Sequence, residues 1–100
     1  MNNISNIDML KIMIGAYYGI EEIDSYKTKE YVLIEIEKMI NNFLEEHKDI
    51  TNYNELDLEV SKLPSINKLQ DSLILLNTMD VSFELVLLVK QKIQELKKGN

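Results

Sequence analysis

Chemistry in this chain would have to come from carboxylates, tyrosines and a single histidine. The sequence holds 17 acidic residues, five tyrosines, one histidine and no cysteine. A zinc site of a familiar type needs several imidazole or thiolate ligands, and His47 cannot build one alone. We therefore interpret His47 as a partly buried histidine near a helix end. We expect no catalytic residue, no cofactor and no metal site, and hence no enzyme.

The carboxylates gather in three clusters within the first sixty residues. The clusters are Glu21, Glu22 and Asp24; Glu45, Glu46 and Asp49; and Glu55, Asp57 and Glu59. Paired acids can hydrolyse glycosides or bind hard metal ions. These acids lack the spacing of a calcium-binding loop, and we expect them at helix edges and in loops. Such charge runs usually form solvated faces, and the alternative is a surface on which another protein docks.

Tyrosines accompany the acids in the same half of the chain. Tyrosine offers a large amphipathic contact area at low entropic cost and is enriched at binding hot spots. The side chains of Tyr17 and Tyr18 point about 100° apart on a helix, so we expect one of them to be exposed. The residues predicted to contact a partner are Tyr18, Glu21, Glu22, Asp24, Tyr26, Glu45, Glu46, Asp49 and Tyr53.

The charge is unevenly distributed, which bears on the kind of partner. The net charge is −6, and residues 1–60 hold 13 acids against 5 lysines, whereas residues 61–100 hold 4 acids and 6 lysines. An acidic surface repels nucleic acid and lipid headgroups and attracts basic proteins. We expect a partner protein with a basic surface, and neither direct nucleic-acid binding nor membrane binding.

All basic residues are lysines, since arginine is absent. Together with the abundant Ile and Asn, this composition is typical of an AT-rich genome, such as that of a low-GC bacterium or its phage. The absence of cysteine fits a reducing, cytoplasmic location.

The elements that carry these residues are predicted to be helices joined by short polar loops, because the chain has only three glycines and one proline. We expect residues 1–100 to form a single all-α domain, a compact bundle of four to five short helices. The expected helices run from Ser5 to Gly19, from Lys27 to His47, from Asn54 to Lys62, from a cap at Ser65 to Leu76, and from Asp80 or Ser82 to the KKGN end. The pair Asn54 and Asp57 has the pattern of a helix cap.

The apolar stretch MLKIMIGAYYGI, residues 9–20, is predicted to be a core helix. It is shorter than the ~20 residues needed to span a bilayer. Gly15 inside a helix indicates close approach of another backbone, and Gly19 is a natural helix stop. The flanks of this helix could pack against the core, against a second copy of the chain, or against a partner protein.

A β-hairpin is the competing prediction for residues 72–90. In VSFELVLLV the apolar residues alternate with period two, and LILL precedes a four-residue polar break. Leucine enrichment and the continuation KQKIQELKK favour helices, with an α+β fold as the alternative.

In layout, the segments LPSINKLQDSLILL and ELVLLVKQKIQEL resemble the C-terminal helical pair of small helical bacteriocin immunity proteins, over about a third of the chain. The resemblance rests on helical patterning and implies a protein that binds and blocks another protein. The small size, the acidity and the lack of catalytic motifs favour a small acidic inhibitor, immunity or antitoxin-like protein that docks on a basic partner. The alternative is a homo-oligomeric structural, assembly or chaperone protein, in which the apolar helix near residues 9–20 forms a homodimer contact.

Overall fold

A computed structural model describes residues 4–24, 26–81 and 83–99, and the regular elements within them are all helices. They are α1 (Asn6–Glu21), α2 (Lys29–Glu46), α3 (Tyr53–Ser61), α4 (Ser65–Leu76) and α5 (Phe83–Lys98). The predicted all-α bundle of four to five helices is confirmed.

Helix α1 begins where its sequence predicts but ends later. Ser5 has an extended backbone, and its hydroxyl oxygen accepts a hydrogen bond of 3.1 Å from the Asp8 backbone N–H. The predicted stop at Gly19 is wrong, because the helix continues to Glu21 and is capped by Glu22 in right-handed conformation. Gly19 instead lies where α4 packs so closely that a Cβ atom would meet the backbone of Lys68.

Helices α2 and α3 form within about two residues of their predicted bounds. In α2 the apolar residues Val32, Ile36 and Ile40 recur at helical spacing and are buried. The predicted cap of α3 is wrong. Asn52 occupies the N-cap position without a side-chain hydrogen bond, and Asp57 lies inside the helix, where its carboxylate accepts a hydrogen bond from Tyr18.

Helices α4 and α5 occupy the region for which a hairpin was the alternative, and no strand occurs among its described residues. Pro64, in extended conformation, precedes α4. Ser65 was expected to cap α4, but it is the first helical residue, and its hydroxyl donates to Glu22 Oε1 at 3.1 Å. Of the two starts predicted for the fifth helix, Asp80 precedes α5 without belonging to it, and Ser82 lies outside the described residues.

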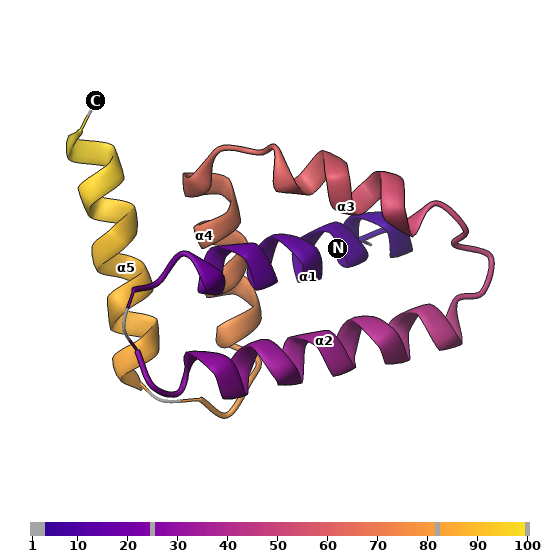
Figure 1. Ribbon diagram of the computed structural model, residues 1–100, viewed down its shortest axis with the longest axis horizontal. Helices are drawn as coiled ribbons and strands as arrows, with labels where there is room; N and C mark the ends of the chain where they lie inside the picture. Colours follow the sequence, from indigo (N-terminus) through magenta and orange to yellow (C-terminus); the bar gives the residue numbers. More distant parts are fainter. Residues whose placement is uncertain (1–3, 25, 82, 100) are drawn as a thin grey trace.

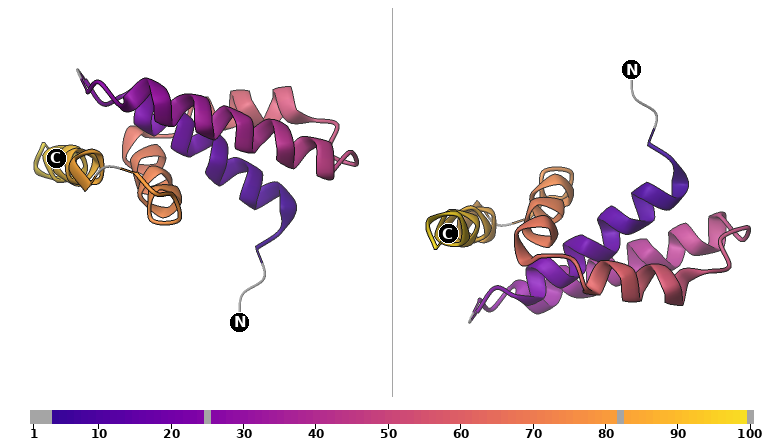
Figure 2. Two further views of the ribbon diagram at one scale, coloured as in Figure 1. Left: turned by 90° about the horizontal axis from the view of Figure 1, so that it is seen from below. Right: turned by 90° about the horizontal axis from the view of Figure 1, so that it is seen from above.

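Helix α1 is the central element of the bundle. Figure 1 shows α1 and α2 running antiparallel, with α3 along the other flank of α1. Figure 2 shows α4 passing across α1 and α5 standing at one end of the molecule, beside α4. Helix α1 packs against α2, α3 and α4, whereas α5 packs mainly against α4.

The apolar stretch of residues 9–20 is therefore covered by the rest of the chain. Its fully or almost fully buried members are Leu10, Met13, Ile14, Ala16 and Ile20. Met9, Tyr17 and Tyr18 are half-buried and pack against the same core. Of the three contacts considered for the flanks of this helix, the contact with the core of the same chain is the one observed. Within the described residues, no helix combines the length and the apolar character that crossing a membrane requires.

Small residues lie in the contact between α1 and α4, which is the most extensive helix contact in the fold. The approach of another backbone predicted at Gly15 is wrong, since a Cβ there would meet only the side chain of Asp71, and the backbone of α4 comes close at Gly19 instead. Ser72 is fully buried, and its hydroxyl shares its proton between the carbonyls of Ala16 (3.1 Å) and Lys68 (3.0 Å). The contact combines steric fit with a satisfied buried hydroxyl.

Candidate functional site

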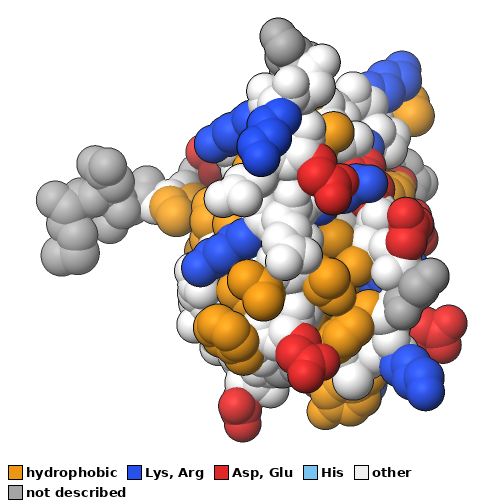
Figure 3. Space-filling model, turned by 90° about the vertical axis from the view of Figure 1, so that its left-hand side faces the viewer, with side chains coloured by type: hydrophobic (Ala, Val, Ile, Leu, Met, Phe, Trp, Pro, Cys, Tyr) orange, Lys and Arg blue, Asp and Glu red, His pale blue; other side chains and the backbone are white. Residues whose placement is uncertain are grey.

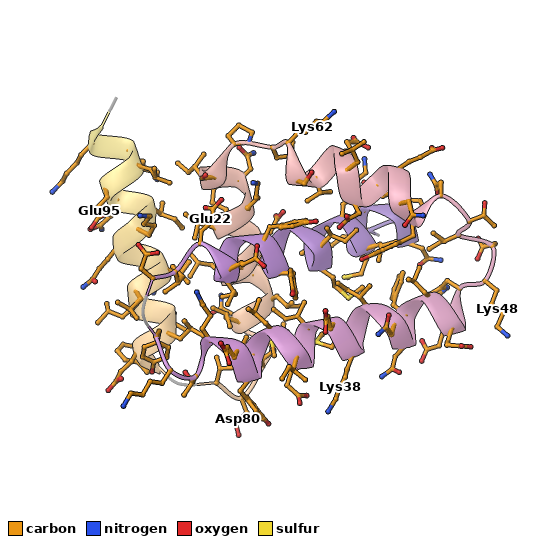
Figure 4. All side chains as sticks on the ribbon, viewed as in Figure 1. Glu22, Lys38, Lys48, Lys62, Asp80 and Glu95 are labelled. Atoms are coloured by element: carbon orange, nitrogen blue, oxygen red, sulfur yellow. The ribbon has the colours of Figure 1, made fainter. Side chains whose placement is uncertain are left out.

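The nine residues predicted to contact a partner do not form one continuous surface. Figure 4 places Glu22 near the α5 end of the molecule and Lys48, the sequence neighbour of Asp49, at the opposite end. Glu21 ends α1, and Glu22, Asp24 and Tyr26 follow it, whereas Glu45 and Glu46 end the antiparallel α2 and Asp49 follows it. Tyr18 and Tyr53 lie between these two acidic ends.

The first acidic end also holds the fold together. Glu22 accepts the Ser65 hydroxyl and forms an ion pair of 3.6 Å with Lys68, and both of these partners are on α4. The Tyr26 hydroxyl donates to Glu84 on α5 at 3.2 Å. Glu21 and Asp24 are exposed. At this end, two of the four predicted contact residues therefore have structural partners within the chain.

The second acidic end is more open. Glu45, Glu46 and Asp49 are all exposed, and Glu45 has a long ion pair of 3.9 Å with Lys48. His47, which caps α2, packs on the Phe43 ring with 4.3 Å between ring centroids, and its Nδ1 lies 3.3 Å from Asn6 Nδ2. The interpretation of His47 as a partly buried residue at a helix C-terminus is confirmed.

Between the two ends, three helices enclose a pocket of about 200 Å³, which we call the tyrosine pocket. Its lining residues are Ile14, Tyr17 and Tyr18 from α1, Glu37 and Ile40 from α2, and Tyr53 and Asp57 from α3. The isoleucines belong to the core, so the pocket has an apolar floor and polar walls. The tyrosines of this pocket are all half-buried, so the expectation that Tyr17 or Tyr18 is exposed is not met.

Tyr18 is held on two sides. Its hydroxyl donates to Asp57 Oδ1 at 2.9 Å, and the Lys68 ammonium lies 5.8 Å from its ring centroid. Burial, followed by the hydrogen bond to Asp57, raises the pKa of Tyr18 from 10.0 to about 12. The phenol therefore stays protonated at neutral pH and acts as a hydrogen-bond donor rather than as a base or a nucleophile.

The other two tyrosines experience the negative charge of the pocket. Burial raises the pKa of Tyr17, and the charge of Glu37 raises it further. Burial also raises the pKa of Tyr53, with added contributions from Asp57 and Glu37. Glu37 thus raises the pKa of Tyr17 on α1 and of Tyr53 on α3, so its charge lies near both of these walls of the pocket.

Ion pairs distinguish Glu37 and Asp57 from several other acids of the chain. Glu22, Glu35, Glu45 and Glu59 each pair with a lysine within 4.0 Å. For residues 4–24, 26–81 and 83–99, no such pair involves Glu37 or Asp57. In the same described residues, no group of three or more His, Cys, Asp or Glu side chains has the arrangement of a metal site.

Sequence reasoning missed three members of this pocket, namely Tyr17, Glu37 and Asp57. Glu37 lies at an exposed position of α2, and Asp57 was predicted to belong to a helix cap. One signal was available in the spacing of Tyr53 and Asp57, which lie four residues apart and so share a helix face. Only the packing of three helices brings them to α1.

A second surface feature lies on α5. Figure 3, which looks onto this side, shows hydrophobic side chains gathered over the lower part of the face. Phe83 and Leu87 lie one turn apart on α5 and are 75% and 43% exposed. Side chains of this size are usually more deeply buried in helical proteins.

Comparison with known proteins gives no functional assignment, since no protein-family model, no curated protein sequence and no solved structure matches this chain.

Proposed function

We propose that this protein is a non-enzymatic factor that acts by binding another protein, whose basic surface docks on its acidic half. The proposed role is that of an inhibitor, immunity or antitoxin-like protein of a low-GC bacterium or phage, acting in the cytoplasm. The observation that carries the proposal is the tyrosine pocket, in which half-buried tyrosines accompany two carboxylates that have no lysine partner in the described part of the chain.

The electrostatics of the pocket support binding rather than catalysis. Raised pKa values keep the phenols of Tyr17, Tyr18 and Tyr53 protonated at neutral pH. A catalytic nucleophile or base needs the opposite, a pKa brought close to the working pH. Protonated phenols beside carboxylates are well suited to holding a cationic or hydrogen-bonding group from a partner.

The position of the pocket also supports docking. Binding energy in protein interfaces concentrates in a few central aromatic residues, surrounded by charges that steer the partner and set its orientation. Here Tyr18 lies near the end of α1 that carries Glu21, whereas Tyr53 begins α3, which follows the end of α2 that carries Glu45 and Glu46. A basic surface would meet negative charge on both sides of the aromatic centre.

Affinity capture tests this proposal. Three proteins would each be immobilised and then exposed to a lysate of the organism that carries the gene: the wild type, the variant E45K/E46K and the control D80K/E95K. All four acids are exposed, and both double variants change the net charge equally. We expect the wild type and the control to retain one basic protein and E45K/E46K to lose it. Retention of only acidic proteins, or equal retention by all three, would refute docking through the acidic half.

The alternative function is homo-oligomeric assembly, and the observation that favours it is the exposed pair Phe83 and Leu87 on α5. The original basis for this alternative, the apolar stretch of residues 9–20, is buried inside the chain. Sedimentation velocity separates the two functions. A stable dimer that dissociates in the variant F83S/L87S supports assembly, whereas a monomer at all concentrations removes it.

A further inference from the structure

The size of the tyrosine pocket limits what it can hold. Its volume is about 200 Å³, whereas sites for small molecules and cofactors commonly measure about 300–1,000 Å³. The pocket opens at the surface between three helices, with an apolar floor formed by Ile14 and Ile40. These dimensions favour a single inserted side chain with an aliphatic stem and a polar head.

The charge of the pocket specifies a cation. Glu37 on α2 and Asp57 on α3 stand in different walls, and neither has an ion pair with a lysine of the described residues. Asp57 uses Oδ1 to accept the Tyr18 hydroxyl, which leaves Oδ2 for a further donor. Glu37 is exposed, but Asp57 is half-buried, and a partly desolvated carboxylate attracts a cation more strongly than an exposed one does because water screens it less.

The aromatic walls add a second form of recognition. Tyr17 and Tyr18 meet edge to face, with 89° between ring planes and 5.9 Å between centroids, so their faces point in different directions. One cation, Lys68, already lies near the Tyr18 ring. Tyr17 and Tyr53 remain to provide faces and hydroxyls, and a cation within about 6 Å of a tyrosine face is attracted by the ring quadrupole.

These features together favour arginine over lysine. A guanidinium is planar, so it can stack on a ring while its N–H groups reach carboxylates in two directions, whereas the lysine ammonium is a compact and strongly hydrated point charge. We propose that the tyrosine pocket receives one arginine side chain of the partner protein, with its guanidinium between Glu37 and Asp57. This assignment rests on the proposed function, because it names the group by which a basic partner is recognised.

Short peptides test the assignment directly on the full chain. Acetyl-Gly-Arg-Gly-amide would be titrated against the ¹⁵N-labelled protein, with two matched peptides that contain lysine or the neutral isostere citrulline. We expect the arginine peptide to shift backbone amides around Tyr17, Glu37 and Tyr53. The lysine peptide should bind more weakly and the citrulline peptide should not bind. Equal shifts from the three peptides, or shifts centred elsewhere, would overturn the proposal.

Neutral variants locate the charge that is responsible. E37Q/D57N should bind the arginine peptide about tenfold more weakly, the loss expected when two partly screened charge contacts are removed. The control E45Q/E46Q removes the same charge outside the pocket and should bind like the wild type. Because an asparagine oxygen can still accept the Tyr18 hydroxyl, we expect the fold to persist. The single variant E37Q, at an exposed position, gives the same test if the double variant unfolds.

The same variants separate this inference from the proposed function. If E45K/E46K loses the basic partner while E37Q/D57N retains it at full strength, the arginine assignment is refuted and docking through the acidic half stands. If the arginine peptide binds in the pocket but the captured partner is acidic, the pocket assignment stands and the proposed function is refuted.

Discussion

Replacing Gly19 with alanine should destabilise the protein strongly, although alanine is the better helix former. In an unconstrained helix the change would stabilise by about 1 kcal/mol. At Gly19 the new methyl group would overlap the carbonyl group of Lys68 and the hydroxyl of Ser72, and neither can yield without moving α4. Overpacking typically costs about 1–3 kcal/mol. A buried hydroxyl that loses its acceptors costs about 1–3 kcal/mol more, so the expected net loss is about 3 kcal/mol.

Gly15 provides the matched control one turn earlier in the same helix. A Cβ at Gly15 would meet the carboxyl group of Asp71, with the Cγ and Cβ atoms of that residue at 3.1 and 3.2 Å. This side chain can rotate toward solvent, because it is only half-buried. The gain in helix propensity should therefore offset the displacement, and Gly15→Ala should lie within about 1 kcal/mol of the wild type.

Urea denaturation followed by far-UV circular dichroism measures both free energies of unfolding. For a domain of this length, a loss of about 3 kcal/mol corresponds to a fall in Tm on the order of 10–20 °C. Combining Gly19→Ala with Ser72→Ala removes one of the two overlapping groups, so the double variant should be more stable than the sum of the single effects. Equal losses at Gly15 and Gly19, or a loss below about 1 kcal/mol at Gly19, would refute the close backbone approach.

Two further predictions concern protonation. Burial raises the pKa of Asp71 from 3.8 to about 6, so the folded state holds a proton that the unfolded state has released, and stability is lost as the pH rises from about 4 to about 6. Asp71→Asn should therefore unfold at higher urea concentration at neutral pH, by about 1–2 kcal/mol after allowance for partial exposure, and the advantage should vanish near pH 4; an advantage independent of pH would contradict it. The pKa of Tyr18 is also raised in the folded state, so the same rule applies at alkaline pH. Its contribution to the free energy of unfolding is fully present below pH 10 and is lost as the pH rises toward 12. Tyr18→Phe should cost about 1 kcal/mol at neutral pH through its lost hydrogen bond and should flatten the alkaline decline, and an unchanged alkaline profile would contradict the Asp57 contact.

The parts of the fold that could be predicted from sequence are those fixed by local physics. The stripe of Val32, Ile36 and Ile40 has helical spacing, and Ser5 precedes a helix with an acid three residues later. Each signal depends on residues within a few positions of one another, so neither needs knowledge of the remaining chain.

Gly19 illustrates why other features could not be predicted. A glycine favours a helix stop because it tolerates left-handed conformation, and it favours a helix crossing because it lacks a Cβ atom. A glycine in the sequence does not show whether it ends a helix or lies at a helix crossing. Which property is used depends on whether another helix lies across that position, and α4 is almost fifty residues further along the chain. The tyrosine pocket has the same origin, since its acids come from the polar faces of separate helices.

The glycine contact and the tyrosine pocket are connected through α1. Because Gly15 and Gly19 let α4 approach closely, Lys68 of α4 reaches both the Tyr18 ring, at 5.8 Å, and Glu22, at 3.6 Å. Tyr18 in turn donates to Asp57 on α3 and so holds one acidic wall in place. A pocket whose walls are positioned before binding loses less conformational entropy when a partner side chain enters. The tight α1–α4 crossing therefore does more than close the core, because it also sets the position of the side chains that would meet a partner.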